Sequence, residues 1–560
     1  MNLIQFEEEK GLTLIDQLLE EQKALTAVGK FAQRHELHEF PQQEKYYRDL
    51  IPFSAPGAGQ QYAFEVDLDQ CSGCKACVTA CHSLNGLDEN EIWRSVGLLH
   101  GSALEKSMQR NITTACHHCV DPACLNGCPT LAYEKNPITG IVRHLDDQCI
   151  GCQYCILKCP YDVPKYSASR GIVRKCDMCS SRLAFGEAPA CVQACPSEAI
   201  RITLVDQKEM AIKFRSHTTS ENSFLPGSPR PDYTLPTTRY KSEKKLPAAL
   251  QAGDFHELKP QPSHSPLIFM LVLTQLSVGT FCFDFLLSNF FSSNVIGPFR
   301  SFNLGVALLF GFAGLCASVL HLGRPLQAWK SFLGIKKSWL SREIVAFAVF
   351  APLAIFYVVG LLTQKIPAIW INRLGMAVIV TGLLALVCSM MIYHDTRREF
   401  WRWPVSGAKF LATTLLLGAA TILFSSTISV VFASQQLFIF KSLSHELSQL
   451  VLLISLVKLA GELLFFRHLR HSEYSSLKRS VLLMTGVLSR ITLLRYVCGT
   501  VGGILLPLIF IFENFNISSP IIFVGLAGVL WMFCIVGELL ERALFFRAVA
   551  PAKMPGGVSS

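Results

Sequence analysis

The stretch Cys149–Pro160, CIGCQYCILKCP, decides the fold of the first half of the chain. It holds Cys149, Cys152, Cys155 and Cys159 in the spacing C-x2-C-x2-C-x3-C-P. This spacing is typical of [4Fe–4S] binding, because a cubane cluster needs four thiolate ligands and a tight loop places only three of them. The fourth cysteine then serves a second cluster, so the run predicts clusters in pairs.

Three further runs of four cysteines surround this one, and together the four runs contain 16 of the 21 cysteines. Strand-like segments accompany the runs, and a proline follows three of them, which indicates a repeat of ferredoxin-like halves. The alternative, structural zinc, usually takes C-x2-C pairs separated by a long gap. The sequence therefore predicts an α+β ferredoxin-like domain with four [4Fe–4S] clusters. The additional ligands would be Cys71, Cys74, Cys77, Cys81, Cys116, Cys119, Cys124, Cys128, Cys176, Cys179, Cys191 and Cys195.

Composition separates the chain into two halves. Hydrophobic residues make up 50% of its 560 residues and the mean hydropathy is +0.34, while the formal net charge is +9. From Pro266 onward there are 23 Lys and Arg against 10 Asp and Glu, so the positive charge belongs to the apolar half. Nucleic-acid binding would need a basic patch on a soluble surface. We therefore expect no nucleic-acid partner.

Eight apolar segments follow, each about 20 residues or longer, which is enough to cross a hydrocarbon core of about 30 Å. The loops after the second, fourth and sixth segments, with the C-terminal tail, carry most of the Lys and Arg. By the positive-inside rule, both termini and the iron–sulfur domain should face the cytoplasm of a bacterial cytoplasmic (inner) membrane. The predicted spans of this all-α domain are residues 267–288, 302–321, 343–363, 369–393, 408–431, 447–466, 492–512 and 520–540.

The chain is thus expected to have five regions. These are a helical extension at 1–61, the four-cluster domain at 62–204, a Pro-rich linker at 205–265, the eight-helix anchor at 266–545 and a tail at 546–560.

Polar residues inside or beside the apolar segments mark candidate sites, because a bilayer segment rarely holds such groups without a function. Lys458 and Glu462 are spaced as an i,i+4 pair and are candidates for a proton path, although such a pair can simply neutralise itself. Two histidines that face each other in mid-membrane are not evident, so we expect no haem. The quinone-site candidates, all near the cytoplasmic face, are His321, Arg324, Arg342, Glu343 and His394.

These features resemble a known family. Residues 62–204 are similar to the four-cluster electron-transfer subunit of dimethyl sulfoxide reductase, and residues 266–545 to the membrane anchor of the same enzymes, with HLGRP and SWLSREI as the best matches. The resemblance implies a natural fusion of two subunits. It also implies menaquinol or ubiquinol as electron donor and a molybdopterin-containing catalytic subunit as a separate partner.

The resemblance further implies how the cysteines combine, with the last two clusters nearer the membrane. The implied sets are Cys71, Cys74, Cys77 with Cys195; Cys81 with Cys176, Cys179, Cys191; Cys116, Cys119, Cys124 with Cys159; and Cys149, Cys152, Cys155 with Cys128.

The predicted function is therefore a membrane-anchored electron conduit without catalytic residues of its own. Quinol electrons would pass through four clusters to a partner that reduces nitrate or an S- or N-oxide. One alternative is the reverse flow, from a formate- or sulfur-oxidising partner into the quinone pool. The others are a redox-driven ion-translocating module and a scaffold whose clusters only hold the fold.

Overall fold

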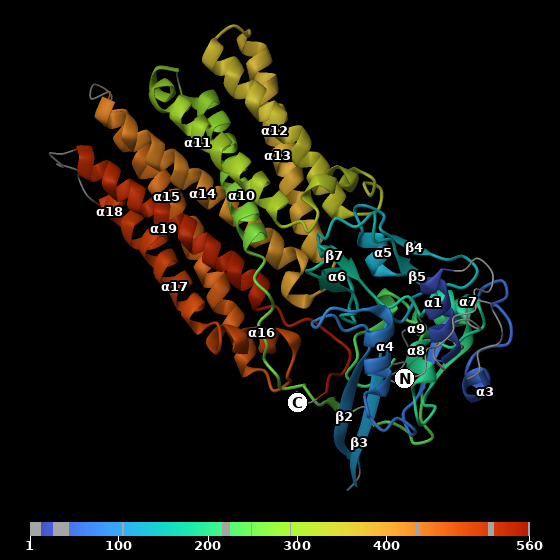
Figure 1. Cartoon of the computed structure of the whole chain (residues 1–560). Helices are drawn as coiled ribbons and strands as arrows, with labels where there is room; N and C mark the ends of the chain where they lie inside the picture. Colours follow the sequence, from blue (N-terminus) through green and yellow to red (C-terminus); the bar gives the residue numbers. More distant parts are fainter. Residues whose placement is uncertain are drawn as a thin grey trace, which may run out of the picture.

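The computed structural model describes residues 13–25, 44–103, 106–215, 224–247, 249–291, 293–432, 437–512 and 520–557. It consists of a soluble domain rich in short strands and a bundle of long helices, which lie side by side (Figure 1). In the N-terminal extension, helix α1 spans Leu14–Leu25, and the continuation of this segment over residues 26–43 lies outside the described residues. The short helix α3 (Glu44–Tyr47) and the turn η1 (Arg48–Leu50) follow.

The soluble domain is framed by strand β1 (Gln60–Asp67), which pairs antiparallel with β8 (Ile200–Asp206), so that the two ends of the cysteine-rich segment lie together. A long hairpin, β2 (Ser95–Ala103) and β3 (Lys106–Thr114), extends from it. Two short hairpins complete the repeat: β4 (Tyr133–Lys135) with β5 (Val142–His144), and β6 (Lys165–Ser167) with β7 (Ile172–Arg174).

Short helices follow the cysteine loops, because each loop turns sharply through residues in the left-handed region. Lys75, His118, Gln153 and Met178 have φ of 63°, 40°, 59° and 62°, one in each of the four runs. Such backbone directs successive N–H groups toward the enclosed sulfurs. The helices are α4 (Ala76–Asn85), α5 (Ala123–Gly127), α6 (Tyr154–Lys158), α7 (Ser180–Ala184) and α8 (Ala190–Gln193). A further helix, α9 (Gln207–Arg215), follows strand β8.

The Pro-rich segment is built into the soluble domain. After the turn η3 (Pro231–Tyr233), strand β9 (Arg239–Lys241) pairs parallel with β1, and β10 (Gln251–Ala252) pairs with β2. The C-terminal tail returns to the same place, where Met554 is buried and the Leu98 N–H donates to the Gly556 carbonyl (3.1 Å). Figure 1 shows the C-terminus beside the β2–β3 hairpin. Both connections therefore tie the soluble domain to the bundle.

Within the part of the chain that the structure describes, the bundle contains eight helical spans long and apolar enough to cross a membrane, as the sequence predicts. The seventh is interrupted by a π-helical turn, η8 (Val501–Leu505), between α17 (Ser489–Thr500) and α18 (Leu506–Phe512). Short elements η4 (Pro325–Phe332), η5 (Glu399–Trp401), η7 (Phe466–Arg470) and α16 (Ser476–Thr485) connect spans. The remaining spans are α10 (Ser265–Phe290), α11 (Ser293–Leu320), α12 (Trp339–Thr363), α13 (Ala368–His394), α14 (Trp403–Phe432), α15 (Leu437–Phe465) and α19 (Pro520–Arg547).

Close backbone contacts join the two parts. A Cβ atom on Gly323 would lie 2.1 Å from the carbonyl oxygen of Gly171, so only glycine fits at this point of the HLGRP turn. Lys158 of α6 donates to the carboxylate of Asp395 (2.6 Å) and to its carbonyl (3.0 Å). The interface places the third cysteine run directly against the ends of α11 and α13.

Candidate functional site

The structure gathers the 16 clustered cysteines into four groups. In the group that contains Cys71, burial raises the pKa of the Cys71 thiol, and negative charges on the neighbouring cysteines raise it further. We number the groups from the surface toward the bundle. Group I is Cys71, Cys74, Cys77 and Cys195; group II is Cys81, Cys176, Cys179 and Cys191; group III is Cys116, Cys119, Cys124 and Cys159; group IV is Cys128, Cys149, Cys152 and Cys155.

The groups have the surroundings that an iron–sulfur cluster requires. Backbone N–H groups of Ala132, Gly151 and Met178 donate to the sulfurs of Cys128 (3.2 Å), Cys149 (3.4 Å) and Cys176 (3.4 Å), respectively. Hydrogen bonds to cluster sulfurs are one of the means by which a protein sets the reduction potential. Among the described residues, no three Cys, His, Asp or Glu side chains converge on one ion. In a cubane each thiolate binds a different iron, so its four ligands do not need to share one.

Buried side chains link successive groups. Arg94 lies between groups I and II, where burial alone would lower its pKa but the thiolates of Cys191 and Cys77 raise it. Lys175 lies between groups II and III and donates to the Cys116 sulfur (3.6 Å). Both side chains are only 2% exposed. Because the negative charge of the nearby thiolates stabilises each cation, both side chains can compensate the negative charge of buried clusters.

An aromatic side chain lies between groups III and IV. Tyr133 is buried, and burial, followed by the charges of Cys155 and Cys124, raises the pKa of its hydroxyl. The four groups therefore form one continuous series. It runs from Cys74, which is exposed at the surface, to Cys152 at the bundle.

A cavity of about 280 Å³ lies between group IV and the membrane helices. Cys152 forms part of its wall, together with His321 and Glu343, which the sequence predicts as quinone-site residues. Most of the remaining wall is apolar, from α10, α11, α12 and α13. A mostly apolar cavity with a few polar groups suits a quinone, whose ring is apolar and whose two oxygens are polar.

The two predicted polar residues differ in their surroundings. Glu343 on α12 is 4% exposed, and its carboxylate accepts a hydrogen bond from the Ser389 hydroxyl on α13. His321 follows α11 directly, and burial lowers its pKa to about 4, with the neighbouring His264 adding to the effect. Both groups thus face the cavity in a water-poor setting.

The structure does not bring the other three candidates into the cavity wall. Arg324 donates to the carbonyl of Asp146 (2.8 Å) and holds the soluble domain in place. Arg342 turns outward to the carbonyls of Ile335 (3.1 Å) and Lys336 (2.9 Å). The His394 ring accepts from the Trp403 N–H (3.3 Å). These three residues lie close to His321 and Glu343 in sequence, but their side chains make these other contacts.

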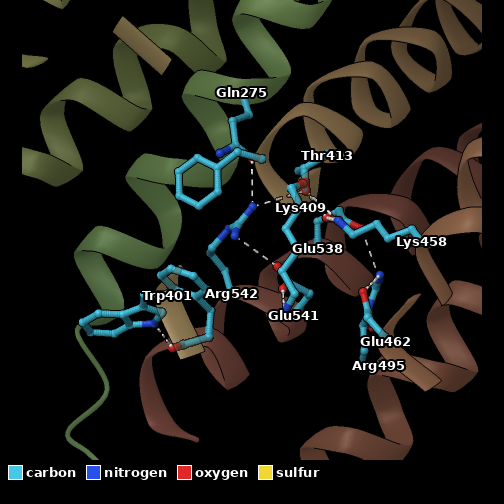
Figure 2. A network of polar contacts seen from close by, with 12 residues as sticks. Gln275, Trp401, Lys409, Thr413, Lys458, Glu462, Arg495, Glu538, Glu541 and Arg542 are labelled. Carbon is cyan, nitrogen blue, oxygen red and sulfur yellow. Dashed lines mark hydrogen bonds and ion pairs between the residues drawn. The ribbon is translucent and has the colours of Figure 1, made fainter. Parts of the chain in front are cut away.

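The expected pair of Lys458 and Glu462 is not formed, and this prediction is corrected. Lys458 is paired with Glu538 of α19, whereas Glu462 accepts two hydrogen bonds from Arg495 of α17 (2.8 and 3.1 Å; Figure 2). The reason is tertiary, because partners on neighbouring helices offer closer contacts than the next turn of α15. These residues belong to a buried network that continues through Thr413, Gln275, Lys409, Glu541 and Arg542.

The network and the cavity are separated by aromatic rings. Tyr393 lines the cavity and packs edge-on against Phe545 at 5.0 Å. On the network side, Arg542 lies over the rings of Phe410 (4.2 Å) and Phe545 (5.4 Å). The contacts of the network join α10, α14, α15, α17 and α19, which indicates a role in holding these helices together.

Sequence reasoning missed several residues of the site. His264 lines the cavity, and Arg94, Lys175 and Tyr133 stand between the cysteine groups. A histidine directly before the first apolar segment is a weak signal that could have drawn attention to His264. No local pattern distinguishes the other three.

Two known families match different parts of the chain. Residues 109–205 match the 4Fe-4S dicluster domain, and residues 262–547, just over half the chain, match the family described as DMSO reductase anchor subunit (DmsC). The chain thus belongs to this family. Its N-terminal part is that of the iron–sulfur subunit of the same enzymes, so the two subunits are fused in one multi-pass membrane protein.

Relatives of the N-terminal part support this identification. The B subunit of anaerobic dimethyl sulfoxide reductase of Haemophilus influenzae is 38% identical over 157 residues, which are 26% of this chain and 76% of the relative. The B subunit of the same enzyme of Escherichia coli K12 is 32% identical over 201 residues, 33% of this chain and 98% of the relative. Hydrogenase-2 operon protein HybA of Escherichia coli O157:H7 is 36% identical over 165 residues, 24% of this chain and 49% of the relative.

Proposed function

We propose that this anchor-family protein transfers electrons from membrane quinol, through four [4Fe–4S] clusters bound at groups I to IV, to a separate molybdopterin-containing catalytic subunit. The observation that carries the proposal is the cavity in which His321 and Glu343 face Cys152 of group IV. Quinol bound there would be in contact with the cluster at group IV. The names of the two B-subunit relatives favour a sulfoxide as the partner's substrate, and nitrate or an N-oxide fits the same chemistry.

Each bound cluster would supply one-electron redox chemistry, and the protein supplies position and proton acceptors. The His321 ring and the Glu343 carboxylate, both in the cavity wall, would accept the two hydroxyl protons of quinol. The apolar wall holds the ring and excludes water. Exposure of Cys74 marks group I as the point of contact with the catalytic partner.

Orientation and electron source complete the proposal. Positive charge in the loops favours a cytoplasmic iron–sulfur domain in the bacterial inner membrane. Menaquinol or ubiquinol would donate without a haem. The same geometry serves the reverse flow from a formate- or sulfur-oxidising partner, and only the potentials of the clusters and the quinone set the direction. The buried network of Figure 2 is assigned to helix packing rather than to ion translocation.

The test is anaerobic reduction of the purified full-length protein by a short-chain naphthoquinol or ubiquinol, followed by visible absorbance and electron paramagnetic resonance. The wild type should show reduced [4Fe–4S] signals. A Glu343→Gln variant should react about 100-fold more slowly, since a positioned proton acceptor contributes roughly 10²–10⁴-fold. The matched control is Arg342→Gln, the preceding residue, whose side chain points away from the cavity.

Dithionite should reduce the clusters in all three proteins at the same rate. Failure of quinol to reduce the dithionite-reducible wild type would refute the proposal. Equal slowing of quinol oxidation in both variants would show that quinol does not react in this cavity.

A further inference from the structure

A second histidine stands beside His321. His264 immediately precedes α10, and its ring lines the cavity edge-on to the His321 ring, with 5.2 Å between centroids. The His264 ring also packs edge-on against Phe546, at 6.0 Å. The His264 carbonyl accepts from the Leu267 (2.9 Å) and Ile268 (3.1 Å) N–H groups, but its side chain does not cap the helix. The ring is therefore directed to the cavity rather than to the helix end.

The His264 ring lies where the cavity approaches the surface. The residue is half-buried, and its sequence neighbours Ser263 and Ser265 are exposed, whereas Tyr154 and Leu271 deeper along the interface are buried. His321 contacts the backbone of Cys152. The His264 ring thus joins the cavity to the exposed start of α10.

Quinol oxidation creates a need for such a connection. Breaking the two O–H bonds of one quinol releases two electrons and two protons. The electrons leave singly through the iron–sulfur series, while the protons must reach water from a cavity with a mostly apolar wall. Glu343 does not itself reach the surface, because it is 4% exposed and its carboxylate accepts a hydrogen bond from Ser389.

We propose that His264 is a second proton-carrying residue of the quinone site. This inference rests on the proposed quinol reaction. His264, whose ring lines the cavity, takes a hydroxyl proton of quinol on a ring nitrogen and releases it to water at the exposed start of α10. In the reverse reaction it delivers a proton to the quinone.

The electrostatic setting agrees with this role. Burial lowers the pKa of His264, and the positive charge of Arg398 lowers it further. His321 is the other titratable group that faces the ring, and Phe546 is apolar. With a lowered pKa the ring is neutral between transfers, and it releases a proton readily after taking one up.

The experiment compares His264→Phe, which keeps a ring against Phe546, with His264→Gln, which keeps a polar side chain that does not titrate. The control is His256→Phe, on the same connecting segment but exposed and packed against Phe255 and Tyr474. Steady-state oxidation of short-chain naphthoquinol by the full-length holoprotein, with an excess of an electron acceptor such as ferricyanide, gives kcat and KM. Both His264 variants should lose at least about 10-fold in kcat with KM within about 2-fold of wild type. Added imidazole should restore the rate.

Wild-type kcat in either folded His264 variant would overturn the inference. So would a loss that appears only in KM or that imidazole leaves unchanged, because those results describe a packing residue. If quinol fails to reduce the wild type itself, the proposed function falls. If the wild type reacts and His264→Phe reacts equally fast, only the role of His264 falls.

Discussion

The buried network of Figure 2 makes an asymmetric prediction about stability. Glu538 is fully buried and is paired with Lys458 through one oxygen and with Arg495 through the other (3.2 Å). Lys458, by contrast, contacts Glu538 and the Thr413 hydroxyl (2.6 Å). Removing the carboxylate should therefore cost more than removing the ammonium group.

The expected loss of stability in each variant depends on whether the remaining charged group keeps a partner of opposite charge. In Glu538→Gln the Lys458 cation loses its anionic hydrogen-bond partner, and an uncompensated buried charge costs about 3–5 kcal/mol. In Lys458→Met the carboxylate keeps Arg495 and Thr413, so the loss should be about 1–2 kcal/mol, in the range of one charged hydrogen bond. The double variant removes both charges and should recover most of the difference, to within about 1 kcal/mol of Lys458→Met.

The measurement is the free energy of unfolding in mixed micelles titrated with sodium dodecyl sulfate, followed by tryptophan fluorescence. All three variants and the wild type complete a double-mutant cycle. The reasoning is refuted if Glu538→Gln is no less stable than Lys458→Met. It is also refuted if the double variant is as unstable as Glu538→Gln alone.

Three further predictions concern the soluble domain and its contacts with the rest of the chain. Cys152→Ser should lower the iron content by up to about four atoms per chain and abolish quinol-dependent reduction; an iron assay with full occupancy would contradict its place as a ligand. Met554→Ala, in the tail, should lower the free energy of unfolding by about 2–5 kcal/mol, because it truncates a buried Met side chain. The expected result is faster proteolysis of the soluble domain. Unchanged cleavage would show that the tail does not stabilise this domain. Gly323→Ala should slow reduction by quinol but not by dithionite, since its Cβ would meet the Gly171 carbonyl oxygen at 2.1 Å. The control for that comparison is Gly305→Ala on α11, where nothing lies within 4 Å.

The local patterns of the sequence predicted much of the architecture. A tight loop such as CIGCQYC needs only its own residues to place three thiolates, so its ligand chemistry can be read without a fold. Likewise, a span such as 369–393 is set by its own length and hydropathy, and helix α13 covers Ala368–His394. These features depend on neighbours along the chain.

Which residues line the cavity depends on the direction in which each side chain points. Glu343 and Arg342 are adjacent in sequence, but the helical turn sends one into the cavity and the other to the loop carbonyls. Lys458 found its partner 80 residues away, on α19 rather than on its own helix. Spacing along one helix cannot predict such partners, because they depend on how the helices pack against each other.

By itself, the sequence determined the iron–sulfur chemistry, the eight spans and the family, since short-range ligand spacing and hydrophobic length carry that information. The tertiary structure alone decided that His264 meets His321, that Cys152 borders the cavity, and that the tail returns to the β2–β3 hairpin. The physical reason is that these contacts join segments far apart in the chain, and their positions are fixed only when the soluble domain packs on the ends of the membrane helices.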